Sequence, residues 1–268
     1  VLYFANFHFI SNGTNYINSQ QPPSPLQNYW SLAVEEQFYL LFPTLFIVVA
    51  RFGRRFDLRA RLAVFLTLAI AASLTWSIMQ TASNGTAAYF SPFTRAWELA
   101  VGALLAVCSR EVARIPRRIA VPATWLGVAG IVAGAYVYGK QTQYPGLASL
   151  LPVICTVAVI AGGTAAPGVG AERLLGWRPV RRLGQLSYPL YLWSWPLLIL
   201  FGQHYIKPLS GGTRVGILIL SLVLADMTYS LVENPIRHAK ALVRNKWASI
   251  SAGLALTGSS FVIVAIER

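Results

Sequence analysis

Eight long apolar runs, separated by short polar segments, set the strongest limit on how this chain can fold. A helix needs about 17 to 25 apolar residues to cross the hydrocarbon core of a bilayer, and each run is that long. Lipid offers no hydrogen-bond partners to the backbone, and the runs lack the alternation of barrel strands, so each should be a helix. The sequence therefore predicts an all-α fold, a polytopic transmembrane helix bundle with eight full spans at residues 29–50, 62–80, 93–109, 119–138, 147–165, 184–206, 214–233 and 247–266.

The first ten residues form a ninth apolar run, which is too short to cross a bilayer alone. We interpret residues 1–10 as a truncated span and expect that the chain is cut from a longer protein. Residues 11–28 should form an extracytoplasmic loop, because Pro22, Pro23 and Pro25 prevent a regular helix. Composition agrees with a membrane protein, since 55% of residues are hydrophobic, only 12% are charged and the mean hydropathy is +0.54.

The basic residues gather at the ends of alternate spans. Of the 22 Lys and Arg residues, 17 fall in residues 51–61, 110–118, 173–182 and 237–246. Basic loops stay in the cytoplasm, so we expect these four loops to be cytoplasmic and the chain to be a multi-pass protein of the cell (inner) membrane. This clustering explains the net charge of +13 without nucleic acid, which would favour one basic face.

Two adjacent carboxylates, Glu35 and Glu36, stand near the start of the first full span, in residues 30–43 (WSLAVEEQFYLLFP). A carboxylate that faces lipid costs a few kcal/mol, so we expect both to face the bundle interior or a wet cavity. On a helix the two diverge, whereas Glu35 and Tyr39 share a face, so one Glu could serve chemistry while the other holds the helix. Alternatively, both stabilise a helix N-terminus after a cap at Asn28 or Ser31.

Other polar side chains within the spans also need an explanation. Arg95 and Glu98 stand at i,i+3, where they can neutralise one another or orient a substrate. In residues 183–196 (LGQLSYPLYLWSWP), aromatic rings and small polar groups could shape a sugar site or form an interfacial aromatic belt. Further along the chain, Asp226 shares a helix face with Tyr229 and Ser230, and Glu233 should pair with Arg237.

Cys108 and Cys155 lie inside apolar runs, with no Cys or His at metal-ligand spacing. We therefore expect no metal site and no disulfide framework. His8, His204 and His238 are isolated in the sequence, and we expect each to be non-catalytic, because a catalytic base needs a partner.

Four segments together resemble the acyltransferase 3 family of membrane O-acyltransferases. They are residues 30–43, 93–105 (FTRAWELAVGALL), 183–196 and 231–237 (LVENPIR). The resemblance implies that residues 1–268 are part of an acyltransferase 3 membrane domain. It implies transfer of an acyl group, often acetyl, from cytoplasmic acyl-CoA to a hydroxyl of an extracytoplasmic glycan or glycolipid. Acyl-CoA would be the donor substrate, and no bound cofactor is expected.

On this resemblance we expect the acceptor site on the extracytoplasmic side, with Glu35 or Glu36 orienting the base or the acceptor. The residues expected to support or line its cavity, as substrate-binding residues, are Trp30, Ser31, Tyr39, Arg95, Glu98, Tyr188, Tyr191, Trp193 and Trp195. The family often has His in its Leu-Tyr-Leu-Trp-His-Trp-Pro pattern, whereas this chain has Ser194, so no proton-transfer role is expected there.

Two family hallmarks, a His in the first span and a cytoplasmic Arg-x-x-Arg motif, would precede this chain. On that mapping, residues 1–10 belong to the third span and residues 247–266 form an extra eleventh one. Members with an eleventh span commonly carry an extracytoplasmic SGNH-type domain behind it.

Two other classes of protein would also place polar residues in such spans. A transporter or lipid flippase uses charges and broken helices around a midplane cavity. In a non-catalytic membrane scaffold, the acidic and aromatic residues would only hold helices together. A donor-dependent gain of acyl mass on a glycan distinguishes the enzyme from both.

Overall fold

The computed structural model describes residues 4–11, 24–52, 55–139, 141–204, 210–239 and 244–266, and within these ranges the chain is helical and has no strand. The all-α prediction is therefore confirmed. In chain order, the elements are α1 (Ala5–Ser11), η1 (Gln27–Tyr29), α2 (Trp30–Arg51), α3 (Leu58–Ser83), α4 (Gly85–Phe90), α5 (Pro92–Val107), α6 (Ser109–Val112), α7 (Arg117–Val137), η2 (Gly146–Ser149), α8 (Leu150–Ala165), α9 (Glu172–Leu175), α10 (Arg178–His204), α11 (Gly211–Thr228), η3 (Tyr229–Glu233), α12 (Asn234–Arg237) and α14 (Lys246–Ile266).

A helix lies at each of the eight predicted spans, and the chain is a multi-pass membrane protein. Five helical segments of the described chain are long and apolar enough to cross a bilayer, at Gln27–Arg51, Leu58–Ser83, Arg117–Val137, Gly146–Ala165 and Gly211–Arg237. The other three predicted spans coincide with α5, α10 and α14. The helix α5 has only 16 residues, and α10 carries arginines in its first turns. The number of crossings and the side on which each loop lies therefore stay predictions.

The chain divides into two compact units, which we describe separately. The α2–α9 unit consists of residues 6–20 and 31–181, and the α10–α14 unit consists of residues 1–5, 21–30 and 182–268. Most of the predicted loop at 11–28 lies outside the described residues.

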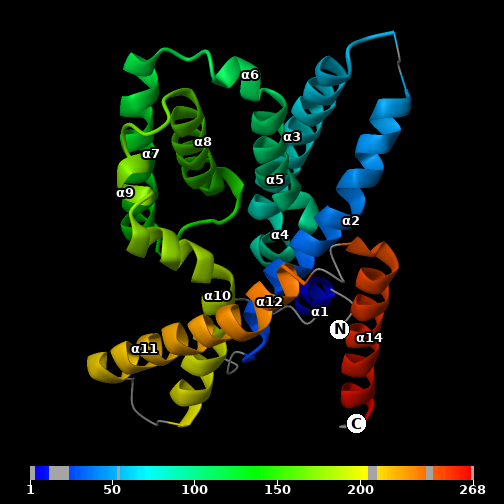
Figure 1. The fold of residues 1–268 in the computed structure, drawn as a ribbon, viewed down its shortest axis with the longest axis vertical. Helices are drawn as coiled ribbons and strands as arrows, with labels where there is room; N and C mark the ends of the chain where they lie inside the picture. Colours follow the sequence, from blue (N-terminus) through cyan, green and yellow to red (C-terminus); the bar gives the residue numbers. More distant parts are fainter. Residues whose placement is uncertain are drawn as a thin grey trace. The chain divides into compact units, whose positions relative to one another are not determined.

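In the α2–α9 unit, two helix pairs pack side by side, α3 along α5 and α7 along α8 (Figure 1). Glycines allow the close approach of α7 and α8. A Cβ atom on Gly127 would lie 2.5 Å from the carbonyl oxygen of Cys155, and one on Gly130 would lie 2.3 Å from Cys155 Sγ. Larger side chains at these two positions would force the helices apart.

Short polar side chains begin the helices that carry the candidate site. Asp57 precedes α3 and accepts hydrogen bonds from the backbone N–H groups of Arg59 and Ala60, at 3.0 and 3.3 Å. Ser91 precedes α5 and accepts a bond from the N–H of Phe93 at 3.3 Å. Such caps satisfy backbone donors that have no partner inside the helix. They fix where α3 and α5 start.

The segment before α8 is anchored to α3. Gly146 has a positive φ of 36°, a conformation that glycine adopts without steric cost. Its N–H donates to Thr81 Oγ1 at 3.0 Å, and the Tyr138 hydroxyl donates to the carbonyl oxygen of Ala148 at 2.6 Å. Tyr144 lies in the sequence between Tyr138 and Gly146, so these two bonds fix its place in the α2–α9 unit.

In the α10–α14 unit, α10 contains Pro189 and Pro196 within its length. The helix α11 runs on through η3, which is a π-helix, into α12. A π-helix is rare and frequently occurs near functional positions.

Candidate functional site

Arg95 and Glu98 form the best-defined polar centre in the α2–α9 unit. Both lie near the start of α5, and Arg95 Nη1 is 3.1 Å from Glu98 Oε1 and 3.5 Å from Oε2. The side chains are 10% and 23% exposed. The predicted i,i+3 pairing is confirmed, and the charge of the buried guanidinium is neutralised locally.

Two tyrosine rings enclose the guanidinium of Arg95. Its Cζ atom lies 5.2 Å from the centre of the Tyr89 ring and 4.7 Å from that of Tyr144. Both distances fall within the range of cation–π attraction. Tyr89 comes from α4 and Tyr144 from the segment before α8. Neither tyrosine was predicted from the sequence, because no local spacing links Tyr144 to a residue 49 positions earlier in the chain.

Ser73 of α3 inserts its hydroxyl into the turn of α5 that contains Arg95. Its Oγ donates to the carbonyl oxygen of Phe93 at 2.5 Å and accepts from the N–H of Trp97 at 3.0 Å. These two backbone groups would otherwise bond to each other as an i,i+4 helix pair. The hydroxyl therefore opens this turn and ties it to α3.

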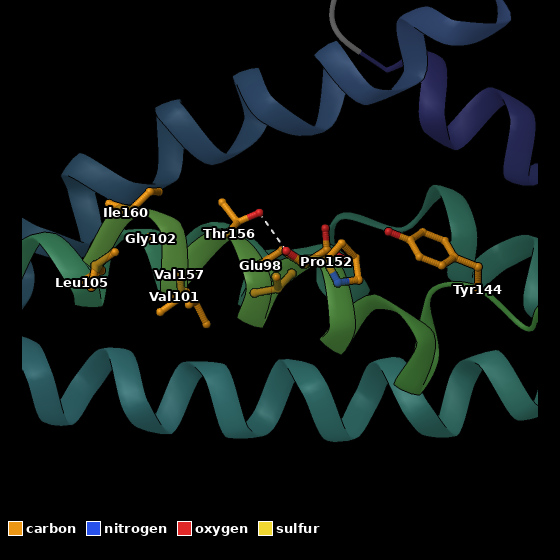
Figure 2. A pocket seen from close by; sticks show the side chains of 10 residues that line it. Glu98, Val101, Gly102, Leu105, Tyr144, Pro152, Thr156, Val157 and Ile160 are labelled. Carbon is orange, nitrogen blue, oxygen red and sulfur yellow. Dashed lines mark hydrogen bonds between the residues drawn. The ribbon is translucent and has the colours of Figure 1, made fainter. Parts of the chain in front are cut away.

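A cavity of about 210 Å³ lies beside the Arg95–Glu98 pair, between α5 and α8. Figure 2 shows Leu105 and Ile160 at one end, Tyr144 at the other, and Glu98 between them. Apart from Glu98, Tyr144 and Thr156, the lining residues have apolar side chains or, at Gly102, no side chain. We call this cavity the α5–α8 groove.

The catalytic candidates Glu35 and Glu36 lie well inside α2, and both are exposed. Among the described residues they therefore do not face the interior of the α2–α9 unit, contrary to our expectation. The opposite face of α2 is the buried one. Ala33 and Val34 are buried on it, and Gln37 Nε2 donates to Oδ1 of the fully buried Asn6 at 3.0 Å. In the described part of the chain, neither glutamate forms an ion pair or a hydrogen bond to the Arg95–Glu98 pair.

The helix-dipole explanation for Glu35 and Glu36 is wrong. The first turn of α2 contains no acidic residue, and helical structure already begins at η1. Interaction with the dipole falls off within the first turn. Asn28 does not act as a cap here, because it lies inside η1 and not before it, and its side-chain amide donates to the carbonyl oxygen of Tyr191 at 2.9 Å.

The other predicted residues of this segment differ in exposure. Trp30 opens α2 and is buried, Ser31 is half-buried, and Tyr39 is 60% exposed. Tyr39 shares its exposed face with Glu35 one turn earlier. Whether these residues contact a substrate stays a prediction.

In the α10–α14 unit, the aromatic residues of α10 bond to neighbouring segments. The Tyr191 hydroxyl donates to the carbonyl oxygen of Asn28 at 2.6 Å, and Trp195 Nε1 donates to that of Ser24 at 3.0 Å. Trp193 Nε1 donates to Thr228 Oγ1 at 3.0 Å. These three polar atoms hold α10 to residues 24–28 and to α11, while the Tyr188 ring is 52% exposed. The prediction that these rings line a sugar site stays open.

A second arginine centre joins α10 to the end of α11. Arg182 Nη2 lies 2.5 Å from Asp226 Oδ1, and the guanidinium Cζ lies 4.8 Å from the centre of the Tyr229 ring. Nη2 also donates to Ser230 Oγ at 3.4 Å. The predicted common face of Asp226, Tyr229 and Ser230 is thus confirmed, and Arg182 is a partner that was not predicted from the sequence. The predicted Glu233–Arg237 pair also forms, at 2.7 Å.

Metal-ligating side chains do not cluster in the described ranges, where no group of three or more His, Cys, Asp or Glu residues could hold an ion. Cys108 and Cys155 are free thiols.

Comparisons with known proteins point to one family. The family model for the acyltransferase 3 domain, described as an acyltransferase domain, matches residues 1–230. YrhL of Bacillus subtilis (strain 168), provisionally named a peptidoglycan O-acetyltransferase, is 30% identical over 248 residues, which cover 88% of this chain and 38% of YrhL. The O-acetyltransferase OatA of Staphylococcus aureus (strain NCTC 8325 / PS 47) is 28% identical, with 88% and 40% covered.

The peptidoglycan O-acetyltransferase OatA of Listeria monocytogenes (serovar 1/2a, strain ATCC BAA-679 / EGD-e) is 27% identical over 247 residues, which cover 88% of this chain and 39% of the relative. No solved structure matches. The chain thus spans about two fifths of the length of these relatives. Because the family model covers most of the chain, this protein belongs to the acyltransferase 3 family.

Proposed function

We propose that the protein is a membrane O-acyltransferase, which moves an acyl group, most simply acetyl, from acyl-CoA to a hydroxyl of a cell-envelope glycan. The observation that carries this proposal is the family match over residues 1–230. The names of the relatives support acetyl as the acyl group and a cell-wall glycan as the acceptor, since two of them are named peptidoglycan O-acetyltransferases. The activity belongs to the full-length protein.

The reaction sets the chemical requirements for the site. The acceptor oxygen attacks the acyl carbon, the thioester C–S bond breaks, and an ester C–O bond forms. The hydroxyl proton passes to a base and coenzyme A leaves as its thiol. General-base help and stabilisation of the oxyanion both lower the barrier. Glu35 and Glu36 are our candidates for the group that orients the base or acceptor.

The donor and acceptor lie on opposite sides of the membrane in this proposal. Four basic loops, at residues 51–61, 110–118, 173–182 and 237–246, would face the cytoplasm and the acyl-CoA pool. Glu35 and the Arg95–Glu98 pair would then lie toward the extracytoplasmic ends of α2 and α5. The acceptor hydroxyl would meet the acyl group at that side.

Membranes that contain the full-length protein provide the test. Acetyl-CoA labelled in its acetyl group is supplied, the cell-wall glycan is isolated, and its gain of labelled acetyl mass is measured. We expect a donor-dependent gain, and a loss of about 100-fold or more in either Glu35→Gln or Glu36→Gln.

Glu111→Gln is the matched control, because Glu111 is an exposed carboxylate on α6, outside the candidate site. The activity of the Glu111→Gln variant should equal that of the wild type. A glycan that gains no acetyl overturns the proposed function. Full activity in both Glu35→Gln and Glu36→Gln overturns their assignment alone.

A further inference from the structure

The α5–α8 groove has two apolar walls formed by one face of each helix. On α5 the lining residues Val101 and Leu105 follow Glu98 at helical spacing, and on α8 Val157 and Ile160 lie opposite. Gly102 lies between the α5 wall residues, and a Cβ atom there would meet no other atom within 4 Å. The groove is therefore open space next to Gly102.

The shape of the groove favours an elongated apolar occupant. Its α8 wall runs from Pro152 to Ile160, about 12 Å at the rise of an α-helix, or roughly two fifths of the hydrocarbon core of a bilayer. The helix η2–α8 is apolar enough to span that core. Apolar cavities do not hold water well, so an alkyl chain from the membrane fits the walls.

The polar end of the groove selects the head of such a molecule. Tyr144 lies at this end and Glu98 lies between it and the apolar walls (Figure 2), and the carboxylate is already neutralised by Arg95. A phosphate would meet this carboxylate, whereas the guanidinium lies against two tyrosine rings. An ammonium group would have to compete with Arg95. An uncharged hydroxyl can donate to the carboxylate in a charge-assisted hydrogen bond.

The head must supply the selectivity, because lipid tails are as apolar as the walls and entry of the chain gains little transfer free energy. Thr156 can only accept a hydrogen bond from the head, since its own proton is donated to the carbonyl oxygen of Pro152 at 2.7 Å. The charged acceptor Glu98, together with Tyr144, therefore supplies the stronger recognition.

We propose that the α5–α8 groove binds one alkyl chain of a membrane amphiphile whose uncharged head carries hydroxyl groups, with that head at Glu98 and Tyr144. The chemistry is that of a glycolipid. As a statement about the acceptor, this rests on the proposed function, because it makes the acceptor glycan a lipid-linked one.

Photolabelling tests the groove without requiring catalysis. The probe is an octyl glucoside that carries a diazirine in its alkyl chain, applied to the full-length protein in lipid nanodiscs, and the labelled peptides are identified by mass spectrometry. We expect labelling of the α5 and α8 wall residues. Unlabelled octyl glucoside should compete at least tenfold better than octyl phosphate.

Gly102→Leu should fill the groove and lower this labelling at least tenfold. The matched control is Gly216→Leu, the same change at an exposed glycine of α11 where an added Cβ also meets no atom within 4 Å, and its labelling should equal that of the wild type. If Gly102→Leu does not fold, Val157→Phe, which narrows the groove from α8, decides in its place. Undiminished labelling in the folded groove variant, or equal competition by octyl phosphate, overturns the inference.

Acyl transfer to the glycan, measured on the same preparations, separates this inference from the proposed function. Labelling of the groove in a protein that transfers no acyl group overturns the proposed function and leaves the binding site standing. Transfer by the wild type without labelling of the groove overturns the inference alone.

Discussion

The buried Arg95–Glu98 pair makes a quantitative prediction about stability. Replacing Glu98 by Leu should lower the free energy of unfolding by about 3 kcal/mol, because the guanidinium of Arg95 would stay buried without its counter-charge. Loss of one partner of a buried pair costs roughly 3–5 kcal/mol. We expect the lower end, since the Glu98 side chain is 23% exposed and two tyrosine rings continue to attract the guanidinium.

A second substitution should recover most of that loss. In the double variant Arg95→Met/Glu98→Leu no charge remains buried, so its free energy of unfolding should lie within about 1 kcal/mol of the wild type. The four proteins of this cycle then give a coupling of about 2 kcal/mol or more between the two residues. The measurement is an unfolding titration with SDS in mixed micelles, followed by circular dichroism.

Asp226→Leu is the control for this cycle. Asp226 also pairs with an arginine, but its side chain is 52% exposed and that of its partner Arg182 is 41% exposed, so the loss should stay below about 1 kcal/mol. Strictly additive losses across the cycle, or a Glu98→Leu variant as stable as the wild type, would refute the reasoning that the pair neutralises a buried charge. An assay of acyl transfer by the folded double variant tests separately whether the Arg95–Glu98 pair orients the substrate. If it does, the double variant should transfer no acyl group.

Three further predictions concern the contacts around the site. Gly130→Leu should destabilise the protein by about 1–3 kcal/mol in the same SDS titration, because its Cβ would lie 2.3 Å from Cys155 Sγ. Gly216→Leu, where an added Cβ meets no atom within 4 Å, should not destabilise the protein. Equal stability of the two variants would contradict the tight α7–α8 contact. Ser73→Ala should lower the free energy of unfolding by about 1 kcal/mol through loss of the bonds to Phe93 and Trp97, and a variant as stable as the wild type would contradict the contribution of these bonds. Trp193→Phe keeps an aromatic ring but loses the bond to Thr228, so it should cost about 1 kcal/mol, and Thr228→Val should cost no more when added to it.

Local spacing was enough to predict the elements and the contacts that form within one helix. Apolar runs of sufficient length placed a helix at every predicted span, because lipid allows the backbone no other partner. The pairs Arg95–Glu98 and Glu233–Arg237 followed from i,i+3 and i,i+4 spacing. Each of these features depends on residues within one continuous segment, and the two ion pairs on residues no more than about one helical turn apart.

Contacts between distant segments could not be predicted in this way. Tyr144 reaches Arg95 only because the loop before α8 is anchored to Thr81 of α3. Arg182 was interpreted only as a topology signal, yet its guanidinium lies between Asp226 and Tyr229, more than 40 residues later. A single sequence contains no period or spacing that announces such contacts. They depend on how the helices pack.

The two arginine centres have the same construction, and this narrows where the chemistry can lie. In each unit an arginine from a span end pairs with a carboxylate and lies against a tyrosine ring, Arg95 with Glu98 and Arg182 with Asp226. Carboxylates at the margins of spans are expensive unless paired or placed in a wet cavity. In the part of the chain that the structure describes, Glu98, Asp226 and Glu233 are each paired with an arginine.

Glu35 and Glu36 are the carboxylates of a described span that have no such partner, and their exposed face is opposite the buried face of α2. Neither the helix dipole nor an ion pair explains their position. A carboxylate without a partner stays available to accept a proton or a hydrogen bond from a substrate hydroxyl, which a paired one does less readily. Of the acidic residues in the described spans, Glu35 and Glu36 are therefore the ones that we propose for orienting the base or the acceptor, and we propose the α5–α8 groove as a separate place for the lipid part of the acceptor.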